Sequence, residues 1–430
     1  MRQHEANCRY NVNVRVLISA GEASSEFYGA QLIEALRRRD SSIGFFGVGG
    51  DRMRAAGCDT LIDTRDLAVV GITEILGHLP KIYQLFGQLI AESDKRKPDL
   101  AIVIDSPAFN WRVARQMHKR GIPVVYYVCP QFWAWRQGRV KLLQKYVTKG
   151  LVIFPFEQKF YRDRGVDATF VGHPLAELPT PAVSREDYAA QYGLDAAKHW
   201  ITLMPGSRSK EVRMNLPTML EAAARMESGY EFLLPVAPTL DRSFVQAMIA
   251  SEIAGPSTSL GSARDESSTA GSSAPPRFTR DDTRPERRSR ITLVSESLPA
   301  LWHSRAGIVA SGTATVEAAV MSTPFVMVYR VSSLTYLLGR HRIKIPHFAM
   351  VNLIAGDRIV PELVQQDFTA AKILQELQKI IPEGRPRQHM LEGLAKVKSS
   401  LRMPGSAQGQ HPADRAADLI LGLSGQVVSR

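Results

Sequence analysis

The chain has 430 residues, of which 44% are hydrophobic and 22% charged, and a formal net charge of +12. This length exceeds one typical core and predicts two domains, and the composition is ordinary for a soluble globular protein. The basic balance suits phosphorylated substrates, an anionic membrane surface or nucleic acid, but no nucleic-acid-binding signature accompanies it, which makes nucleic acid the least favoured partner.

The three cysteines are widely spaced and none has a CxxC neighbour. This usage argues against a disulfide framework and against a thiolate metal site, and it indicates a reducing compartment. The first ten residues are polar and do not resemble a secretion signal, and no stretch reaches the roughly 18 apolar residues that span a bilayer. We therefore expect a soluble or peripheral protein.

The first part of the chain alternates short apolar strands with helices. A turn of small residues containing Gly21, Glu22 and Ser24 follows the first strand. Since strands without polar alternation are covered on both faces, the series predicts a parallel sheet between helices, with ligands at the carboxyl ends of the strands. The expected strands are Val14–Ser19, Phe45–Val48, Leu100–Ile104, Val124–Val128 and Leu151–Phe154.

The segment from Leu67 to Leu89 is amphipathic and unusually apolar at its start. An apolar patch beside a ligand site suggests acyl chains or a membrane surface. Two buried helices would explain the same pattern equally well. The candidate patch residues are Val69, Val70, Ile72, Ile75 and Leu76.

Asp105 directly follows the apolar strand Leu100–Ile104. A carboxylate at such a strand end points out of the core, and partial burial would raise its pKa toward the range useful for a general base. The same position would equally suit the N-cap of the next helix. Spacing alone favours neither the general base nor the N-cap.

Three aromatic residues and an arginine follow the strand Val124–Val128. Phe132, Trp133, Trp135 and Arg136 are typical of a platform for a sugar or an acyl chain. Core packing is at least as good an explanation for Phe132 and one of the tryptophans. His173 stands in a Gly-His-Pro turn, where a lone histidine is more often structural than catalytic.

A second strand series follows a Pro-containing stretch and indicates the domain division. We expect an N-terminal domain at 12–177, a linker at 178–198 and a C-terminal domain at 199–430. Residues 254–290 are rich in Ser, Gly, Pro and Arg and predict a disordered insertion in the second domain. The expected strands of that domain are Ile201–Met204, Phe232–Val236, Ile291–Val294, Ile308–Ala310 and Pro324–Tyr329.

Two turns of the second series are suited to anions. Gly206, Ser207 and Arg208 end its first strand, and the arginine adds a permanent cation with a planar donor fork. Ser311, Gly312 and Thr313 lie between an apolar strand and a helix start, where free amides and the helix dipole attract phosphate. Glu317, one turn into that helix, could accept hydrogen bonds from ribose hydroxyls. The alternatives are a helix cap with a solvated arginine and an ordinary strand-to-helix turn.

In this order, these segments closely resemble the lipid-A-disaccharide synthase family of bacterial glycosyltransferases. The resemblance covers roughly residues 14–385 apart from the insertion. So many co-ordered motifs are more specific than any single one. The matching segments are AGEAS at 20–24, LAVVGITEILG at 67–77, IDSPAFN at 104–110, FWAWR at 132–136, FPFE at 154–157, VGHPL at 171–175, MPGSR at 204–208, SGTATVE at 311–317 and VNLIAGDRIVPEL at 351–363.

The resemblance implies an α/β fold of GT-B type, with two Rossmann-like parallel-sheet domains facing a cleft, the acceptor in the first and the nucleotide sugar in the second. It implies transfer of 2,3-diacylglucosamine from UDP-diacylglucosamine to the 6-hydroxyl of 2,3-diacylglucosamine 1-phosphate, with inversion and without metal or cofactor. It also implies peripheral attachment to the anionic cytoplasmic face of the inner membrane. The oligomeric state, monomer or homodimer, stays open.

Carried over residue by residue, the resemblance makes Asp105 the candidate base and Arg208 the phosphate-binding arginine. It places Asn352 near the nucleotide. The remaining donor-side candidates are Gly206, Ser207, Ser311, Gly312, Thr313 and Glu317. The acceptor-side candidates are Gly21, Glu22, Ser24, Trp135 and Arg136.

Two alternatives and one departure accompany this interpretation. A UDP-N-acetylglucosamine 2-epimerase would share the fold and the donor turn but would not need the apolar region at 67–89. A lipid-binding protein on a degenerate transferase scaffold would not need Asp105, Arg208 and Glu317 together. The family usually has Gly-Asp where this chain has Ser25 and Glu26, and the change bears on the geometry of the acceptor-side turn.

Overall fold

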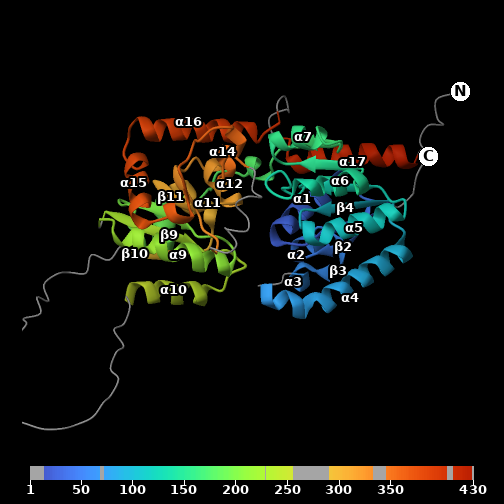
Figure 1. Cartoon of the computed structure of the whole chain (residues 1–430), viewed down its shortest axis with the longest axis horizontal. Coiled ribbons are helices and arrows are strands. Elements are labelled where there is room, and N and C mark those ends of the chain that lie inside the picture. Colours follow the sequence, from blue (N-terminus) through green and yellow to red (C-terminus); the bar gives the residue numbers. More distant parts are fainter. Residues whose placement is uncertain are drawn as a thin grey trace, which may run out of the picture. The chain divides into compact units, whose positions relative to one another are not determined.

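The structure, a computed structural model, describes residues 14–67, 72–227, 229–254, 290–332, 345–403 and 410–428. The chain forms two compact units (Figure 1). Unit 1 consists of Met1–Leu178, Leu338–Ile345 and Lys398–Arg430. Unit 2 consists of Pro179–Leu337 and Pro346–Val397.

Unit 1 contains a seven-stranded sheet of order β3-β2-β1-β4-β5-β6-β7, in which every neighbouring pair is parallel. The order reverses between β1 and β4, so the turns after these two strands lie side by side at one edge of the sheet. Such a reversal is where open α/β sheets bind ligands. The strands are β1 (Arg15–Ala20), β2 (Gly44–Gly49), β3 (Cys58–Asp63), β4 (Leu100–Ile104), β5 (Val124–Tyr127), β6 (Lys149–Val152) and β7 (Ala168–Phe170).

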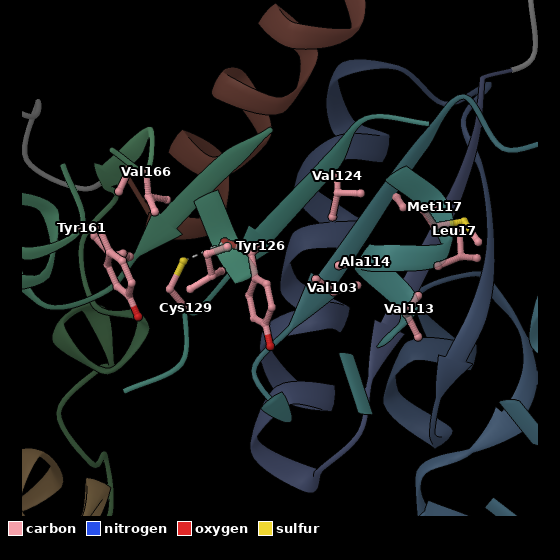
Figure 2. Packing of buried hydrophobic residues seen from close by; sticks show 14 of the residues in the cluster. Leu17, Val103, Val113, Ala114, Met117, Val124, Tyr126, Cys129, Tyr161 and Val166 are labelled. Atoms are coloured by element: carbon pink, nitrogen blue, oxygen red, sulfur yellow. Dashed lines mark hydrogen bonds between the residues drawn. The ribbon is translucent and has the colours of Figure 1, made fainter. Parts of the chain in front are cut away.

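Helices and short helical turns connect the strands of unit 1. They are α1 (Ala23–Arg39), α2 (Asp51–Ala55), α3 (Thr64–Leu67), α4 (Ile72–Arg96), α5 (Pro107–Lys119), η1 (Gln137–Arg139), α6 (Val140–Tyr146), α7 (Pro155–Arg162), η2 (Pro174–Glu177) and α17 (Pro412–Val428). Leu17 and Val103 on the sheet and Val113 and Met117 on α5 belong to one buried cluster (Figure 2). Because side chains alternate across a strand, Val16 and Ile18 face the other layer, where α1 packs against β1.

Unit 2 contains a six-stranded sheet of order β10-β9-β8-β11-β12-β13, again parallel throughout. Here the order reverses between β8 and β11, which brings the turns after these strands together. The strands are β8 (His199–Met204), β9 (Tyr230–Pro235), β10 (Arg290–Val294), β11 (Ala306–Ala310), β12 (Phe325–Tyr329) and β13 (Glu362–Val364). The helical elements are α8 (Arg185–Tyr192), α9 (Ser209–Ala224), α10 (Arg242–Ala254), α11 (Ser297–His303), α12 (Thr313–Val320), α14 (Met350–Ala355), η3 (Gln365–Asp367), α15 (Ala370–Ile380) and α16 (Arg385–Ser400).

The end of the chain differs from its expected place. Residues from Lys398 onward, expected in the second domain, belong to unit 1. There α17, the red helix of Figure 1, packs along α1. Arg39 pairs with Asp414 at 2.8 Å and with Asp418 at 2.5 Å. The chain returns to unit 1 at Lys398. No local sequence pattern indicates this return, so it was not expected.

The expected linker is also partly structured. Helix α8 lies within it, and Tyr188 and Ala189 pack with Trp200 of β8 in a small core cluster of unit 2. Most of the expected insertion, 255–289, lies outside the described residues. Among the helices that the structure describes, none combines the length and the apolar character needed to cross a bilayer.

Candidate active site

The turn after β4 carries Asp105, and a buried amide holds its backbone in an unusual conformation. Asp105 and Ser106 have φ values of +47° and +45°, in the left-handed region. Asn110, fully buried on α5, donates from Nδ2 to the carbonyl oxygens of Ile104 at 2.8 Å and Asp105 at 3.0 Å. Its Oδ1 accepts a 2.7 Å bond from the Ser19 hydroxyl on β1.

A second contact to Asp105 comes from the next strand. The hydroxyl of Tyr126 donates to the Asp105 carbonyl at 2.7 Å, so the half-buried carboxyl group stands on a backbone held from three elements. The N-cap of α5 is Ser106. The N-cap position that the sequence left open for Asp105 is thus taken by Ser106.

The turn after β1 lies directly against this one. A Cβ atom added at Gly21 would come within 2.6 Å of the Ser106 hydroxyl, so only glycine fits there. Ser25 closes the following helix turn, because its hydroxyl accepts from the Glu22 amide at 2.9 Å and donates to the Glu22 carbonyl at 2.7 Å. Glu26 reaches α2, where it accepts from the Arg52 amide at 2.8 Å. Ser25 and Glu26, which stand where the family usually has Gly-Asp, thus both have hydrogen-bond partners within the protein.

Residues 130–136 are anchored through Trp133 by a buried carboxyl group that the sequence analysis did not single out. Glu157 on α7, 1% exposed, accepts from the Trp133 indole nitrogen at 2.8 Å and from the Phe154 amide at 3.1 Å. Burial raises the pKa of Glu157 to about 8, and the Asp105 carboxylate adds to the rise. A carboxyl group with this pKa holds its proton at neutral pH.

This arrangement separates the two tryptophans of the segment. Phe132 and Trp133 are each 6% exposed and belong to the interior, whereas Trp135 is 49% exposed. The guanidinium of Arg136 lies 4.3 Å from the centre of the Trp135 ring. Only Trp135 and Arg136 are therefore available as a platform.

Other unit 1 candidates are structural or undescribed. His173 is fully buried, and its Nδ1 accepts from the Leu175 amide at 3.1 Å. Burial lowers its pKa to about 3, which supports a structural role. Val69 and Val70 lie outside the described residues, as do the side chains of Ser24, Ile72, Ile75 and Leu76.

In unit 2, the turn after β8 is organised by Glu211. Its Oε2 accepts from the amides of Ser207 at 3.1 Å and Arg208 at 3.4 Å. A Cβ added at Gly206, which has a φ of +125°, would meet this carboxylate at 2.5 Å. The Arg208 side chain is 70% exposed and its Nη1 lies 3.3 Å from Glu211 Oε1. An exposed pair of this kind is weak and can be exchanged for another anion.

The turn after β11 is open. Gly312, at the N-cap of α12, has φ +138° and ψ −160°, a conformation that essentially only glycine adopts. No side chain of the described residues caps α12, a Cβ on Gly312 would meet nothing within 4 Å, and Gly312 and Thr313 are exposed. Ser311 is anchored instead, donating from its hydroxyl to the Phe348 carbonyl at 2.8 Å. The Thr315 amide donates to the Gly312 carbonyl at 3.2 Å, so the amides left to a ligand at this exposed turn are those of Thr313 and Ala314.

Glu317 stands one turn into α12. Its Oε2 accepts a 2.7 Å bond from the Ser297 hydroxyl at the start of α11. Burial raises the pKa of this carboxyl group. One carboxylate oxygen is thus engaged by the protein, and the group stays close to the open turn.

Asn352 has a different role from the expected one. It is fully buried, its Oδ1 accepts from the amides of Ile359 and Val360, each at 2.9 Å, and its Nδ2 donates to Glu362 Oε1 at 2.8 Å. Glu362 also accepts from the Phe348 and Ala349 amides. Asn352 therefore organises the loop behind Ser311, and its amide has no atom to offer a nucleotide.

The organising carboxyl groups of Glu157, Glu211 and Glu362 were all missed from the sequence. A signal existed for two of them, since Glu157 and Glu211 stand at the third position of their helices, where a carboxylate commonly caps backbone amides. The hydrogen-bond partners of Glu362 are ten or more residues away in the sequence, so no local pattern indicates its role. Within the ranges that the structure describes, no group of three or more His, Cys, Asp or Glu side chains is arranged to hold a metal ion.

Comparison with known proteins identifies full-length relatives. A family model described as lipid-A-disaccharide synthetase matches residues 16–260 and 276–408. A lipid-A-disaccharide synthase of Koribacter versatilis is 48% identical over 412 residues, which are 96% of this chain and 99% of the relative. Those of Acidobacterium capsulatum and Myxococcus xanthus are 48% and 38% identical, over 91% and 95% of this chain and 93% and 97% of the relatives.

Solved structures resemble the chain in fold. A UDP-GlcNAc 2-epimerase from Neisseria meningitidis bound to UDP-GlcNAc superposes with a TM-score of 0.59 at 11% identity, covering 96% of this chain and 100% of the other. The calicheamicin glycosyltransferase CalG4 gives 0.54 at 15% identity, covering 97% and 99%. At these identities the likeness shows the fold alone. The expected α/β fold of GT-B type is confirmed.

Proposed function

The chain belongs to the lipid-A-disaccharide synthase family and is a glycosyltransferase, and from that premise we propose how its residues carry the reaction. The enzyme transfers 2,3-diacylglucosamine from its UDP carrier to the 6-hydroxyl of 2,3-diacylglucosamine 1-phosphate and releases UDP. The observation that carries the assignment of roles is the open turn at Gly312 and Thr313, which presents uncapped amides to an anion. The likeness to epimerases at 11% identity concerns the fold only.

Asp105 acts as the general base on the acceptor. Its carboxylate takes the proton of the 6-hydroxyl while that oxygen bonds to the anomeric carbon of the donor sugar. The bond from that carbon to the diphosphate oxygen breaks, the configuration inverts, and UDP leaves with the bonding electrons. In support, the half-buried side chain stands on a backbone fixed by Asn110 and Tyr126, so little reorganisation is needed.

The donor diphosphate binds to unit 2. The first amides of α12 and the helix dipole attract its negative charge, and Arg208 exchanges its weak contact with Glu211 for a phosphate oxygen. Gly206 and Ser207 shape the second turn. Glu317, held by Ser297, accepts hydrogen bonds from the ribose hydroxyls. These roles require positive charge and amide donors and involve no metal ion.

We further propose that the enzyme works as a peripheral protein on the cytoplasmic face of the inner membrane, because an acceptor with two acyl chains resides in a lipid leaflet. The net charge of +12 supports binding to anionic headgroups. The segment at 67–77 supplies the apolar contact, through Val69, Val70, Ile72, Ile75 and Leu76. Changing three of these to Ser should weaken binding to anionic vesicles and leave UDP binding intact, whereas unfolding would show that they are core. A homodimer is the assembly to test by light scattering.

The assignment is tested with purified enzyme in detergent. UDP-diacylglucosamine and diacylglucosamine 1-phosphate should yield the disaccharide and UDP in equal amounts. Omission of the acceptor should stop UDP release, which excludes simple hydrolysis. Conversion of UDP-N-acetylglucosamine to its 2-epimer, with no disaccharide formed, would overturn the proposal in favour of the epimerase alternative.

A further inference from the structure

A single hydrogen bond joins the turn after β10 to the donor-side helix of unit 2. Ser297, the first residue of α11, is half-buried and donates from its hydroxyl to Glu317 Oε2 on α12 at 2.7 Å. Helix α11 packs against α12. Among the residues that the structure describes, no other side chain reaches this carboxylate through a hydrogen bond or an ion pair. The orientation of the Glu317 carboxylate therefore depends on Ser297.

The bond from Ser297 leaves the other carboxylate oxygen of Glu317 to a ligand. Within the described ranges Oε1 has no hydrogen-bond partner, yet it is not enclosed by protein, unlike the unpartnered amide oxygen of Asn215. Burial of the side chain raises the pKa of Glu317, and the hydrogen bond from Ser297 opposes that rise. Ser297 thus favours the charged form of a carboxylate that accepts hydrogen bonds through Oε1.

The position of Glu317 on α12 relates this oxygen to the open turn at Gly312. Glu317 follows Thr313 by four residues, so the two share one face of the helix and lie about 6 Å apart along its axis. Side chains of a helix lean toward its N-terminus, which directs Glu317 back toward the exposed turn. A nucleoside diphosphate whose phosphate meets the amides of that turn places its ribose diol at a comparable distance.

We propose that Ser297 is a positioning residue that fixes Glu317 for the cis-diol of a ribonucleotide, and that the donor site selects ribonucleotides through this pair. The inference rests on the proposed function, which assigns the ribose to Glu317. A carboxylate with one oxygen held by the protein presents the other in a fixed direction. A nucleotide without the diol leaves that oxygen without water and without a partner, and a site built for a hydroxyl rejects an analogue that lacks it. Without Ser297 the carboxylate can turn away, and the selection weakens.

The test compares UDP with 2′,3′-dideoxy-UDP, which differ only in the diol, by calorimetry on the full-length enzyme without acceptor. Wild-type enzyme should bind UDP about tenfold more tightly or better. In Ser297→Ala this ratio should fall to about threefold, because the affinity for UDP weakens and that for the dideoxy compound does not. Ser297→Thr keeps a hydroxyl and should restore the ratio.

Ser295→Ala is the matched control for Ser297→Ala. It removes a hydroxyl from the same turn, but that hydroxyl accepts from Tyr192 Oη at 3.2 Å and does not contact Glu317. The Ser295 amide keeps its own 3.3 Å bond to Tyr192 Oη in the variant. The ratio of the two affinities should therefore stay at its wild-type value.

Four outcomes would overturn the proposal. Equal weakening of both nucleotides in Ser297→Ala would give Ser297 a merely structural role, and an unchanged ratio would show that Glu317 keeps its position without it. A ratio that falls equally in Ser295→Ala would assign the effect to the turn as a whole. Equal binding of both nucleotides by the wild-type enzyme would show that the diol is not recognised.

The measurement also separates this inference from the proposed reaction, because it needs neither acceptor nor turnover. Selection of UDP that depends on Ser297 would stand even if no disaccharide formed. A normal yield of disaccharide together with a ratio that is independent of Ser297 would refute this inference and leave the proposed function intact.

Discussion

The strand-end turns of the two units hold their backbones in different ways. In unit 1, the left-handed positions of the candidate site are Asp105, Ser106 and Arg136, none of which is glycine. In unit 2, the corresponding positions are Gly206 and Gly312. A non-glycine residue in that region stores strain, which the surroundings must over-determine. Around Asp105, unit 1 does this with the buried side chains of Asn110 on α5 and Tyr126 on β5. In unit 2, the Glu211 carboxylate caps the turn at Gly206, and the turn at Gly312 is open.

The difference separates two ways of building a site. The base needs one fixed position, and the unit 1 turn fixes it through Asn110 and Tyr126 at the cost of strain. The diphosphate needs close approach to backbone amides, and a glycine without a Cβ atom permits it. Changes in unit 1 should therefore alter turnover or stability, and changes in unit 2 should alter nucleotide binding.

The largest expected effect is that of Asp105→Asn. Asparagine tolerates the left-handed conformation, so the turn should survive, but it cannot accept a proton. We expect kcat to fall by a factor on the order of 10² to 10⁴ with an unchanged melting temperature. Steady-state kinetics and thermal melting measure both. A variant that turns over at a near-normal rate would remove Asp105 from the mechanism.

The unit 2 counterpart is Gly312→Ala. The new Cβ meets no atom within 4 Å, but the conformation with φ +138° is strained by about 1–3 kcal/mol for alanine. Relief of that strain displaces the amides, so UDP affinity should fall about tenfold. Gly384→Ala is the control, because Gly384 has φ +152° in the same unit, with Pro386 at 3.9 Å from the new Cβ, and no assigned role. Equal UDP affinity in both variants, measured by calorimetry, would contradict the open-amide site.

An effect on stability, with no change in ligand binding, concerns Glu157 and pH. Its pKa is about 8 in the folded protein against 4.5 for the unperturbed group, so the unfolded chain releases the proton first as pH rises. Stability from this group is present below about pH 4.5 and is lost as pH rises toward 8, at no more than about 1.4 kcal/mol per pH unit. Glu157→Gln, which resembles the protonated form, should flatten this decline between pH 5 and 8. If the unfolding free energies of wild type and variant changed with pH in the same way, Glu157 would have to be ionised in the folded protein.

The smallest expected effect is that of chelation. If Arg208 and the amides of α12 hold the diphosphate, EDTA should leave the rate of disaccharide formation unchanged. The rate is measured with and without the chelator in metal-depleted buffer. A loss that Mg²⁺ or Mn²⁺ restores would show that the donor side needs a cation.

Local patterns sufficed for much of the fold. Apolar runs of three to six residues located ten strands within about two residues of their observed ends, because burial on both faces leaves a strong signal in a short window. Strand ends in turn located Asp105, Gly206 and Gly312. The strands that were not anticipated, β3, β7 and β13, are polar or only three residues long, as at Cys58–Asp63 and Ala168–Phe170.

The tertiary structure decided what depends on residues far apart in sequence. Trp133 and Trp135 are alike in the sequence, and only the buried Glu157, 24 residues beyond Trp133, assigns one to the interior and the other to the surface. Asn352 lies in a segment that matches the family pattern, and only the structure shows that its side chain is engaged by Glu362. Helix α17 joins the first unit through contacts with α1. One of them pairs Arg38 with Asp414, which are 376 residues apart in the sequence. Periodicity reports only which side of an element is buried, and it carries no information about which distant element covers that side.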